Sequence, residues 1–416
     1  MSYVQDKRQL HLAEFLLGYT GARPYTWRKE TRSPDARRLS SPLKKHLESV
    51  NRFLFGGGVN VDVLEAGEED PRQALLDTCL PKLLNKLDQI WERGATTGAV
   101  LICYYPDPQD FYKFKVYDGS EIKPHPEDPQ GYRVTYWGEN DKYVRLGYTS
   151  SAWEYYKPTK DPYRPWELVE TVPHPYQSPP CQIIYNIQPI SPTNHCEGLP
   201  EFDGTALELA LEILLQNLDA ASNYRYFGHP LITSTYPEEV LEALAKRVQV
   251  LPAPQSRDMG ETKALDLRAV PDSHAPFVEG LKRDLAEHLG SAYIKPDSPP
   301  QTSSIALRLL HSASISTAEK RWESYVQNGL VPLFSKVLLA ATYDGLYTAA
   351  VPSDPTTYQV QVSRKQPYFA PTPQDKLAIL GVVQQLVAMG VDPTEAMREY
   401  YPQLSEEEIE EKMVGD

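Results

Sequence analysis

Apolar residues recur at helical spacing in the first quarter of the chain. Leucines three and four residues apart predict a helix from Leu75 to Arg93, because this spacing places them on one face. Pro81 lies inside this segment and predicts a kink or the start of a second helix. Gly94 and Gly98 predict the end of the helix, and the apolar run from residue 99 to 105 predicts a buried strand.

The same helical spacing returns in other parts of the chain. It predicts helices over residues 5–17, 40–54, 205–226, 277–293 and 304–327. Asp203 is the expected N-cap of the third of these helices. Asn328-Gly329 and Pro332 predict a break or kink after the last one. Residues 357–364 then predict a strand, and the segment after Pro371 predicts a small helical module.

Between residues 111 and 185 the period changes to the two-residue alternation of strands. Short segments rich in β-branched and aromatic residues are separated by Gly, Asp or Pro, which predicts strands joined by turns. Tyrosine and tryptophan are frequent in this region. We expect these rings to pack within the sheets and not to form a stacking platform for nucleic-acid bases.

Composition indicates a folded protein of more than one module. The chain has 416 residues, of which 41% are hydrophobic and 24% charged. No apolar run approaches the roughly 20 residues of a membrane helix, so we expect no membrane association. The four cysteines (Cys79, Cys103, Cys181 and Cys196) lack metal-binding or redox spacing and are expected to be reduced thiols of a protein made in the cytoplasm.

The net charge of -14 is distributed unevenly. Residues 1–55 hold 11 Lys/Arg against 5 Asp/Glu, whereas residues 371–416 hold 3 against 10. An acidic chain is not an obvious nucleic-acid binder, because phosphate affinity comes mainly from clustered Lys and Arg. Such a surface still suits DNA that must slide without sticking. Solubility is the simpler explanation of the acidity, and both explanations stay open.

The motifs of common enzyme classes are missing from the sequence. Gly56-Gly57-Gly58 has no following Lys-Ser/Thr and predicts a turn or hinge, not a phosphate cradle. His195 and Cys196 are adjacent but lack further metal ligands at suitable spacing. No serine occupies a GxSxG motif, and no carboxylate pair stands out. We therefore expect a protein that is not an enzyme, with no catalytic residue, metal site or cofactor.

A stiff segment separates the two helices predicted around residue 300. The stretch YIKPDSPPQTSSIALRLL combines three prolines with Thr302, Ser303 and Ser304 directly before a helix. Prolines restrict the unfolded chain, so a loop of this composition loses less entropy when it is held in one shape. An ordinary surface turn between two helices is the alternative.

The order of these units resembles that of the portal proteins of tailed bacteriophages, which are head-to-tail connectors. Four stretches carry the resemblance: LLNKLDQIWERGATTGAVLICYYPD with the following VYDGSEIKPHPEDPQGYRVTYW, then NIQPISPTNHCEGLPEFDGTALELALEILLQNLDAASNYRYFGHPLI, then SPPQTSSIALRLLHSASISTAEKRWESYVQNGLVPLF, and the tail after Pro371. Together they span most of residues 70–416. The Ser-Gly usual in the family before its long helix is Ser303-Ser304 here, which leaves the extent of the loop open.

The resemblance implies an α+β, mainly helical portal fold, with a β-rich wing, stem helices, a small α/β clip and a helical crown, assembled as a ring. The implied divisions are the N-terminal wing 1–200, stem helix 201–227, clip 228–273, second stem helix 274–293, tunnel loop 294–304, long wing helix with β segment 305–370, and crown 371–416.

The resemblance also implies two sets of site residues. The tunnel loop facing DNA would comprise Lys295, Asp297, Ser298, Pro299, Pro300, Gln301, Thr302, Ser303 and Ser304. Their small polar groups can touch a phosphate backbone weakly and without sequence preference. Docking of partners at the clip would use Lys246, Arg247, Arg257, Lys263 and Arg268, for which a solvated mixed-charge surface is the alternative.

The implied function is a conduit at one capsid vertex of a virion, through which double-stranded DNA is packaged and later ejected. The implied partners are further copies of the chain in a ring of about twelve, a separate terminase motor, the major capsid protein and a neck or tail adaptor. Two alternatives stay open: another structural ring protein of a virion, such as an adaptor or baseplate component, and an enzyme built on the aromatic-rich β region.

Overall fold

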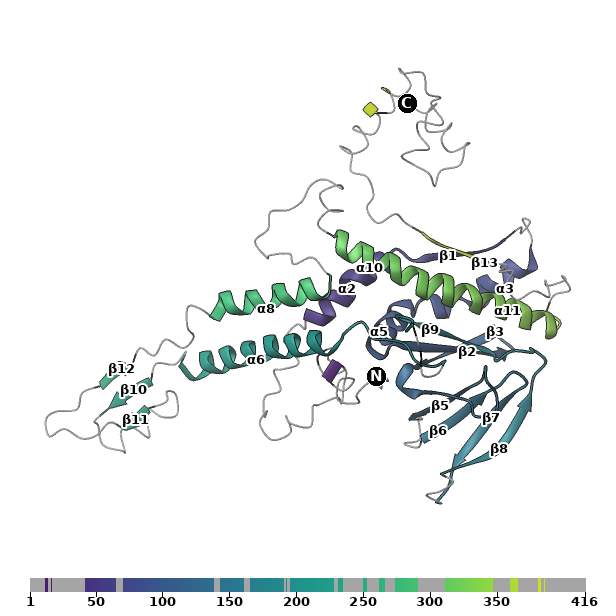
Figure 1. Cartoon of the computed structure of the whole chain (residues 1–416), viewed down its shortest axis with the longest axis horizontal. Coiled ribbons are helices and arrows are strands. Elements are labelled where there is room, and N and C mark those ends of the chain that lie inside the picture. The colour runs from purple at the N-terminus through teal and green to yellow at the C-terminus, as the bar shows by residue number, and fades with distance from the viewer. Residues whose placement is uncertain are drawn as a thin grey trace.

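The computed structural model is a mixed α and β protein (Figure 1). It describes residues 12, 13, 16, 42–64, 70–137, 143–160, 165–190, 192, 195–227, 231–234, 250–252, 262–265, 274–290, 311–346, 360–365, 381, 382 and 385. Side chains at 221–227 and in the strands between 231 and 265 are not part of this description. None of the described helices has both the length and the apolar content needed to cross a membrane.

Helices and strands alternate in blocks along the chain. The helices are α2 (Pro42–Leu54), α3 (Pro71–Cys79), α4 (Pro81–Leu84), α5 (Leu87–Thr97), η3 (Gly119–Glu121), α6 (Gly204–Phe227), α8 (His274–His288), α10 (Ser312–Trp322), η4 (Glu323–Leu330) and α11 (Val331–Tyr343). The strands are β1 (Val59–Val63), β2 (Ala99–Asp107), β3 (Phe111–Asp118), β4 (Ile122–Pro124), β5 (Tyr132–Trp137), β6 (Tyr143–Tyr148), β7 (Ala152–Pro158), β8 (Trp166–Pro173), β9 (Cys181–Tyr185), β10 (Leu231–Ser234), β11 (Val250–Pro252), β12 (Thr262–Leu265) and β13 (Val360–Arg364).

The described strands form four sheets. A five-stranded antiparallel meander runs in the order β4-β5-β6-β7-β8, and a three-stranded antiparallel sheet has the order β3-β2-β9. β1 pairs antiparallel with β13, although some 300 residues separate them. The small sheet β11-β10-β12 lies at the far end of α6 and α8, with β10 and β11 parallel.

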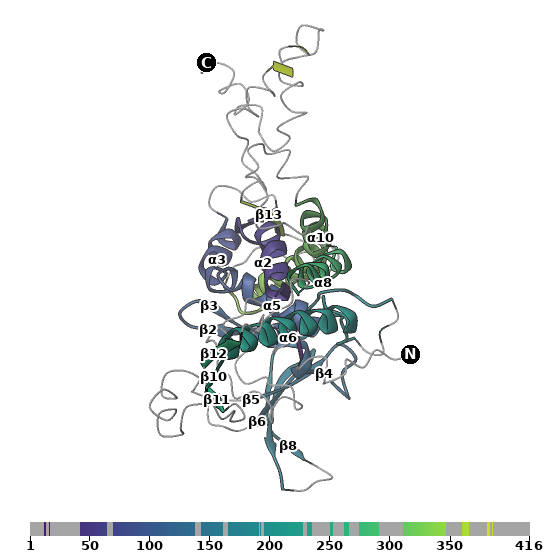
Figure 2. The ribbon, with the colours of Figure 1, turned by 90° about the vertical axis from the view of Figure 1, so that its left-hand side faces the viewer.

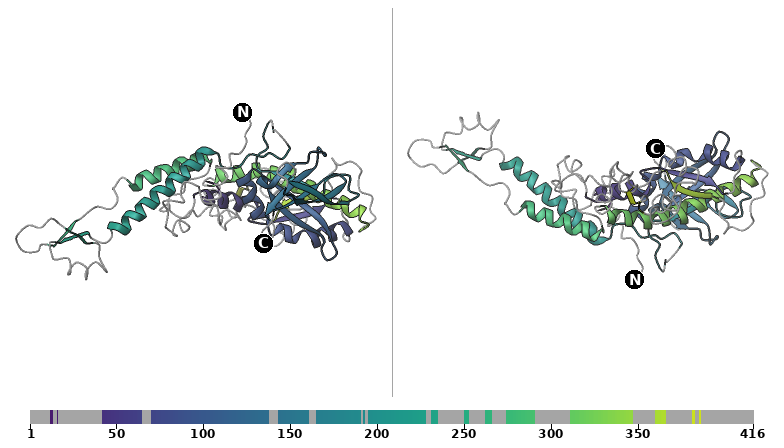
Figure 3. Two further views of the ribbon diagram at one scale, coloured as in Figure 1. Left: turned by 90° about the horizontal axis from the view of Figure 1, so that it is seen from below. Right: turned by 90° about the horizontal axis from the view of Figure 1, so that it is seen from above.

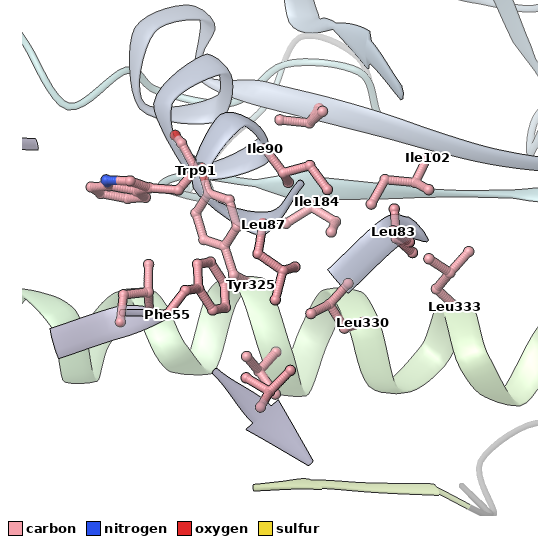
Figure 4. Packing of buried hydrophobic residues seen from close by; sticks show 14 of the residues in the cluster. Phe55, Leu83, Leu87, Ile90, Trp91, Ile102, Ile184, Tyr325, Leu330 and Leu333 are labelled. Atoms are coloured by element: carbon pink, nitrogen blue, oxygen red, sulfur yellow. Dashed lines mark hydrogen bonds between the residues drawn. The ribbon is translucent and has the colours of Figure 1, made fainter. Parts of the chain in front are cut away.

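Strand β2 is buried on both faces, as the apolar run at residues 99–105 predicts. Val100 and Ile102 point into a large core shared with the helices, and Leu101 and Cys103 point into a second core between the two larger sheets. Successive side chains of a strand point to opposite faces, so an uninterrupted apolar run fits a strand between two layers. Figure 4 shows Ile102 and Ile184 above Tyr325, Leu330 and Leu333 of the long helix.

Pro81 divides the helix predicted from Leu75 to Arg93. Helix α3 ends at Cys79, Pro81 opens the short α4, and α5 follows after a turn. Proline has no N–H to donate, and the first turn of a helix needs none. The prediction for Gly98 is confirmed, since it caps α5 with a φ of 87°. The prediction for Gly94 is wrong: it lies inside α5, where the hydroxyl of Tyr325 occupies the space of a Cβ.

The sequence predicts a break or kink at Asn328-Gly329 and Pro332; the helical run does not break there but changes to a wider helix. The chain continues from α10 to α11 through η4, one and a half to two turns of wider π-helix. Gly329 is needed there for packing, because a Cβ would lie 2.8 Å from the side chain of Ile184 on β9. Pro332 falls in the first turn of α11, where the change of hydrogen-bond register tolerates its missing N–H. Tertiary packing therefore overrides the local breaking signals.

Many described aromatic residues of the β region pack within the sheets, as predicted, whereas Phe111, Tyr143 and Tyr155 are exposed. Tyr117 and Tyr148 are buried between the two larger sheets and share a hydroxyl contact of 2.9 Å. Tyr112 and Tyr176 both donate to the carboxylate of Asp344 at the end of α11, over 2.6 and 2.9 Å. These contacts fix the sheets to each other and to the long helix.

The molecule is elongated. α6 and α8 lie side by side and project from the body, which holds the two larger sheets at its other end (Figures 1 and 3). In the view along the helix pair, the five-stranded sheet lies below the helical layer (Figure 2). The structure thus separates a compact body from a long helical hairpin.

The contact between Gly98 and Gly198 offers a test of the body. A Cβ on Gly98 would lie 2.2 Å from the carbonyl oxygen of Gly198, and φ is positive there. We expect Gly98→Ala to lower the free energy of unfolding by about 2 kcal/mol or more. In the matched control Gly280→Ala, in α8, a Cβ meets nothing within 4 Å. The control is expected to raise stability by about 0.5–1 kcal/mol. Urea denaturation measures both, and equal stability of the two variants would contradict the assigned contact.

Candidate functional site: the helix pair and the buried network at its base

Helix α6 begins at the carboxylate that the sequence predicts as its N-cap. Asp203 accepts a hydrogen bond from the backbone N–H of Ala206 at 2.9 Å. Its two oxygens also lie 2.9 and 3.0 Å from Nε2 of His288. Partial burial would raise the pKa of Asp203, but the hydrogen bonds from Ala206 and His288 together lower it. The capping residue thus also joins the start of α6 to the end of α8.

Helix α8 runs antiparallel to α6, with one polar contact near each of its ends. His288 meets Asp203 at the body, and Nε2 of His274 lies 3.1 Å from the backbone carbonyl of Gln216. Helix α6 has 24 residues, which corresponds to about 36 Å at 1.5 Å per residue. The pair is therefore a long hairpin with its tip sheet, β11-β10-β12, at the far end.

Helix α6 carries apolar residues outside the described core as well as within it. Ala206, Leu207, Ala210 and Ile213 are buried in the core. Leu211, Leu215 and Leu218 are only half-buried and lie outside that core. The spacing of these three leucines places them on one side of the helix. We call them the uncovered leucine face; a helix with apolar residues on more than one side normally packs against more than one neighbour.

Charges on the helix pair are mainly acidic. Glu208 and Asp219 are exposed on α6, close in angle to Leu215. The two helices carry six Asp/Glu against three Lys/Arg. Glu279 and Lys282 of α8 form an ion pair of 3.0 Å that is open to solvent. A surface of this composition attracts phosphate groups weakly.

A buried carboxylate holds the base of the hairpin to the body. Oε2 of Glu201 accepts hydrogen bonds from Nε of Arg321 at 2.9 Å and from Nδ2 of Asn186 at 3.1 Å. Oε1 lies 3.6 Å from Nε2 of His46, and the Glu201 side chain is only 6% exposed. The backbone N–H of Glu201 donates to the carbonyl of Ala95 at 2.7 Å. Residues of α2, α5 and α10, with the residue that follows β9, thus converge on Glu201 shortly before α6 begins.

The pKa of Glu201 reflects these neighbours. Burial alone would raise it, but His46 and Arg321 lower the pKa to about 2. The carboxylate is therefore charged at neutral pH and paired with the guanidinium of Arg321 inside the protein. A buried carboxylate of this kind is destabilising without its partners.

Asn186 extends the network to the long helix. It is fully buried, and its Oδ1 accepts the hydroxyl of Tyr325 at 3.3 Å. Its Nδ2 also lies 3.3 Å from the carbonyl of Leu199, and its backbone N–H donates to the carbonyl of Gly98 at 2.9 Å. The local sequence around Glu201 and Asn186 gave no signal for this network, because its members are distant in the chain.

The structure tests little of the site predicted from sequence. The tunnel-loop residues (Lys295, Asp297, Ser298, Pro299, Pro300, Gln301, Thr302, Ser303 and Ser304) lie outside the described residues. So do Lys246, Arg247, Arg257 and Arg268 of the predicted clip. Lys263 lies in β12, where its Cα is paired with that of Thr233. Most of the predicted site residues therefore remain predictions.

Metal ligands do not cluster in the described part of the chain. No group of three or more His, Cys, Asp or Glu side chains there is arranged to hold a metal ion. All four cysteines are described, and all four are buried thiols.

Comparisons with known proteins give remote similarities only. No protein-family model and no curated protein matches the chain. Among solved structures, a chain in the virion of a native gene transfer agent particle is 11% identical, with 90% of this chain and 94% of that chain covered and a TM-score of 0.42. A chain in the neck of the native particle, computed with C12 symmetry, is 13% identical over 88% and 93%, with a TM-score of 0.45. A chain in the neck of the empty particle, computed with C6 symmetry, is 11% identical over 88% of both chains, with a TM-score of 0.40.

The Glu201 network gives a prediction about stability and its pH dependence. Glu201→Gln leaves Arg321 without its charged partner, so we expect the free energy of unfolding at pH 7 to fall by about 3 kcal/mol. The pKa of Glu201 is about 2 in the folded protein, below the 4.5 of a free glutamate side chain. The stabilisation is therefore complete above about pH 4.5 and is lost as the pH falls toward 2.

Urea denaturation from pH 7 down to pH 3 checks both statements. The difference in stability between the unmodified chain and Glu201→Gln should shrink as the pH falls. The control Glu279→Gln removes an exposed pair and should change stability by less than about 1 kcal/mol at any pH. A difference that stays constant with pH would contradict the assigned charge of Glu201.

Proposed function

We propose that the chain is one subunit of a ring-shaped channel for double-stranded DNA, of the portal type found at one vertex of a phage capsid. The observation that carries the proposal is the helical hairpin: α6 and α8 project from a body that holds the β-rich layers, and a small sheet joins them at the tip (Figure 1). The portal resemblance of the sequence assigns this part of the chain to the stem and clip. The hairpin has the order of elements that this assignment requires.

The uncovered leucine face supports assembly into a ring. Leu211, Leu215 and Leu218 lie on a projecting hairpin, where a single chain leaves them partly in water. A neighbouring copy that packs its own hairpin beside this face would bury them. Head-to-tail contacts of this kind close into a ring when each copy is rotated by the same fraction of a turn.

The acidic balance of the hairpin supports passage of DNA without retention. Each phosphate that a cation neutralises adds to affinity, so a channel wall with few unpaired cations holds DNA weakly. The proposed function needs no catalytic residue in this chain; a separate terminase motor would drive packaging. The major capsid protein would surround the ring, and a neck or tail adaptor would replace the motor after packaging.

The first test is the native mass of the purified chain. Twelve copies of the 47.1 kDa chain would form a ring of about 565 kDa, and mass photometry with negative-stain images would show both the mass and the hole. Replacing Leu211, Leu215 and Leu218 by serine should reduce the ring to smaller species without loss of helical circular dichroism. Leu346→Ser, on an exposed leucine at the end of α11, should leave the ring intact. A stable monodisperse dimer in the unmodified chain would contradict the proposed ring.

The second test concerns the predicted tunnel loop. Deleting residues 299–304 should leave ring assembly unchanged, because the residues that we assign to the subunit contact lie on α6. DNA packaging or retention should fall, measured as nuclease-protected DNA per particle. A deletion that abolishes the ring would show that this segment serves assembly and would contradict its assignment to the DNA channel.

A further inference from the structure

The five-stranded sheet has an outer face that packs against no other described layer. Its inner face carries Val134 and Leu146, which are buried against the three-stranded sheet. Side chains alternate along each strand, so Arg133 and Arg145 lie on the opposite, outer face. The register pairs Arg145 of β6 with Tyr156 of β7, and Tyr156 with Leu168 of β8. We call Lys123, Arg133, Arg145, Tyr156, Trp166 and Leu168 the arginine face.

Aromatic rings hold both guanidinium groups in place. Cζ of Arg133 lies 4.9 Å from the centroid of the Tyr156 ring, and its Nη2 donates to the Tyr156 hydroxyl at 2.9 Å. Cζ of Arg145 lies 4.4 Å from the centroid of the Trp166 ring, and its Nε donates to Oγ1 of Thr135 at 2.9 Å. Contacts of this kind limit the motion of a long side chain before any ligand arrives.

No carboxylate neutralises these two cations within the described residues. Glu154 lies on the same face, but it accepts the hydroxyl of Tyr156 and contacts Nε2 of His125 at 3.0 Å. Burial and the nearby Arg133 lower the pKa of Arg145, and Tyr156 partly opposes them. Nε of Arg133 is buried without a hydrogen-bond partner. Two guanidinium groups that lie close together without a carboxylate partner among the described residues are suited to an anionic ligand.

The surroundings of the arginines favour a protein ligand over nucleic acid. Leu168 is 48% exposed beside them, and Val169 is 63% exposed at the neighbouring edge. Arginine and aromatic residues next to exposed apolar side chains are typical of protein interfaces. Among the described residues this face carries three cations, Lys123, Arg133 and Arg145, whereas duplex DNA is usually held by about 6–10 phosphate contacts.

The edge of the sheet is not suited to strand addition. β7 and β8 change register between Tyr155 and Tyr156, which leaves Val169 as an extra residue in β8. A bulge at an edge strand disfavours pairing with another strand, and Glu167 and Glu170 would repel an acidic one. A ligand is therefore expected to lie across the face and not along the edge.

We propose that the arginine face binds an acidic segment of another protein, with carboxylates on Arg133 and Arg145 and an apolar side chain against Leu168. This surface lies on the body, away from the helical hairpin, so it does not depend on the proposed channel. The carboxylates would accept hydrogen bonds from the two guanidinium groups. An apolar neighbour on the same segment would cover Leu168.

Fluorescence anisotropy with a labelled octapeptide, Gly-Glu-Leu-Glu-Glu-Leu-Glu-Gly, tests the proposal on the full chain. We expect saturable binding that weakens as NaCl rises from 50 to 300 mM, because exposed charge pairs are screened. The same peptide with Gln for Glu should bind at least about tenfold more weakly. The double variant Arg133→Gln/Arg145→Gln should show the same loss. Arg93→Gln is the matched control, since Arg93 already pairs with Asp118 at 3.3 Å, and it should bind normally.

Three results would overturn the proposal. The first is no binding of the Glu peptide up to about 1 mM, the weakest affinity worth assigning. The second is equal binding of the Glu and Gln peptides. The third is a 20-base-pair DNA duplex that binds through Arg133 and Arg145 while the peptide does not, which would make the ligand a phosphate backbone. If the double variant fails to fold, two measurements on the unmodified chain still test the proposal. These are the dependence of peptide binding on NaCl and the comparison of the Glu and Gln peptides.

Discussion

The buried carboxylate of Glu201 is the interaction on which the arrangement of the two parts depends. A charged group is costly to bury, and here Arg321, Asn186 and His46 offset that cost from three separate segments. Glu201 stands two residues before Asp203, the N-cap of α6. The contacts of Glu201 therefore fix the start of α6 and with it the direction in which the hairpin leaves the body. Loss of any one partner would leave a buried charge and loosen that direction.

The body is built to resist such loosening. β2 contributes to two cores at once, and the run α10–η4–α11 crosses the large core beside it. The π-helical turns of η4 bring Tyr325 against Trp91 and to the hydroxyl contact with Asn186. Interiors packed at this density transmit displacement instead of absorbing it. A hairpin anchored in such a body could carry the contacts of the proposed ring without deforming the β layers.

The uncovered leucine face and the arginine face, the two surfaces proposed to bind partners, differ in chemistry. The hairpin offers leucines next to carboxylates, which suits a second copy of the same hairpin. The arginine face offers fixed cations next to one exposed leucine, which suits an acidic partner. They lie on different parts of the molecule, the projecting hairpin and the outer sheet (Figures 1 and 2). A subunit of this kind could therefore bind its own copies and a different protein at the same time.

The sequence by itself determined the local elements. Leucine spacing located the helices, Pro81 and Gly98 marked two boundaries, and Asp203 identified the start of α6, because these signals act over a few residues. The tertiary structure decided the rest. β1 pairs with β13 across some 300 residues, Gly329 stays inside a continuous helix because Ile184 fills the space beside it, and Glu201 meets partners from distant segments. No local pattern encodes such contacts, because burial and charge pairing become defined only when remote segments pack together.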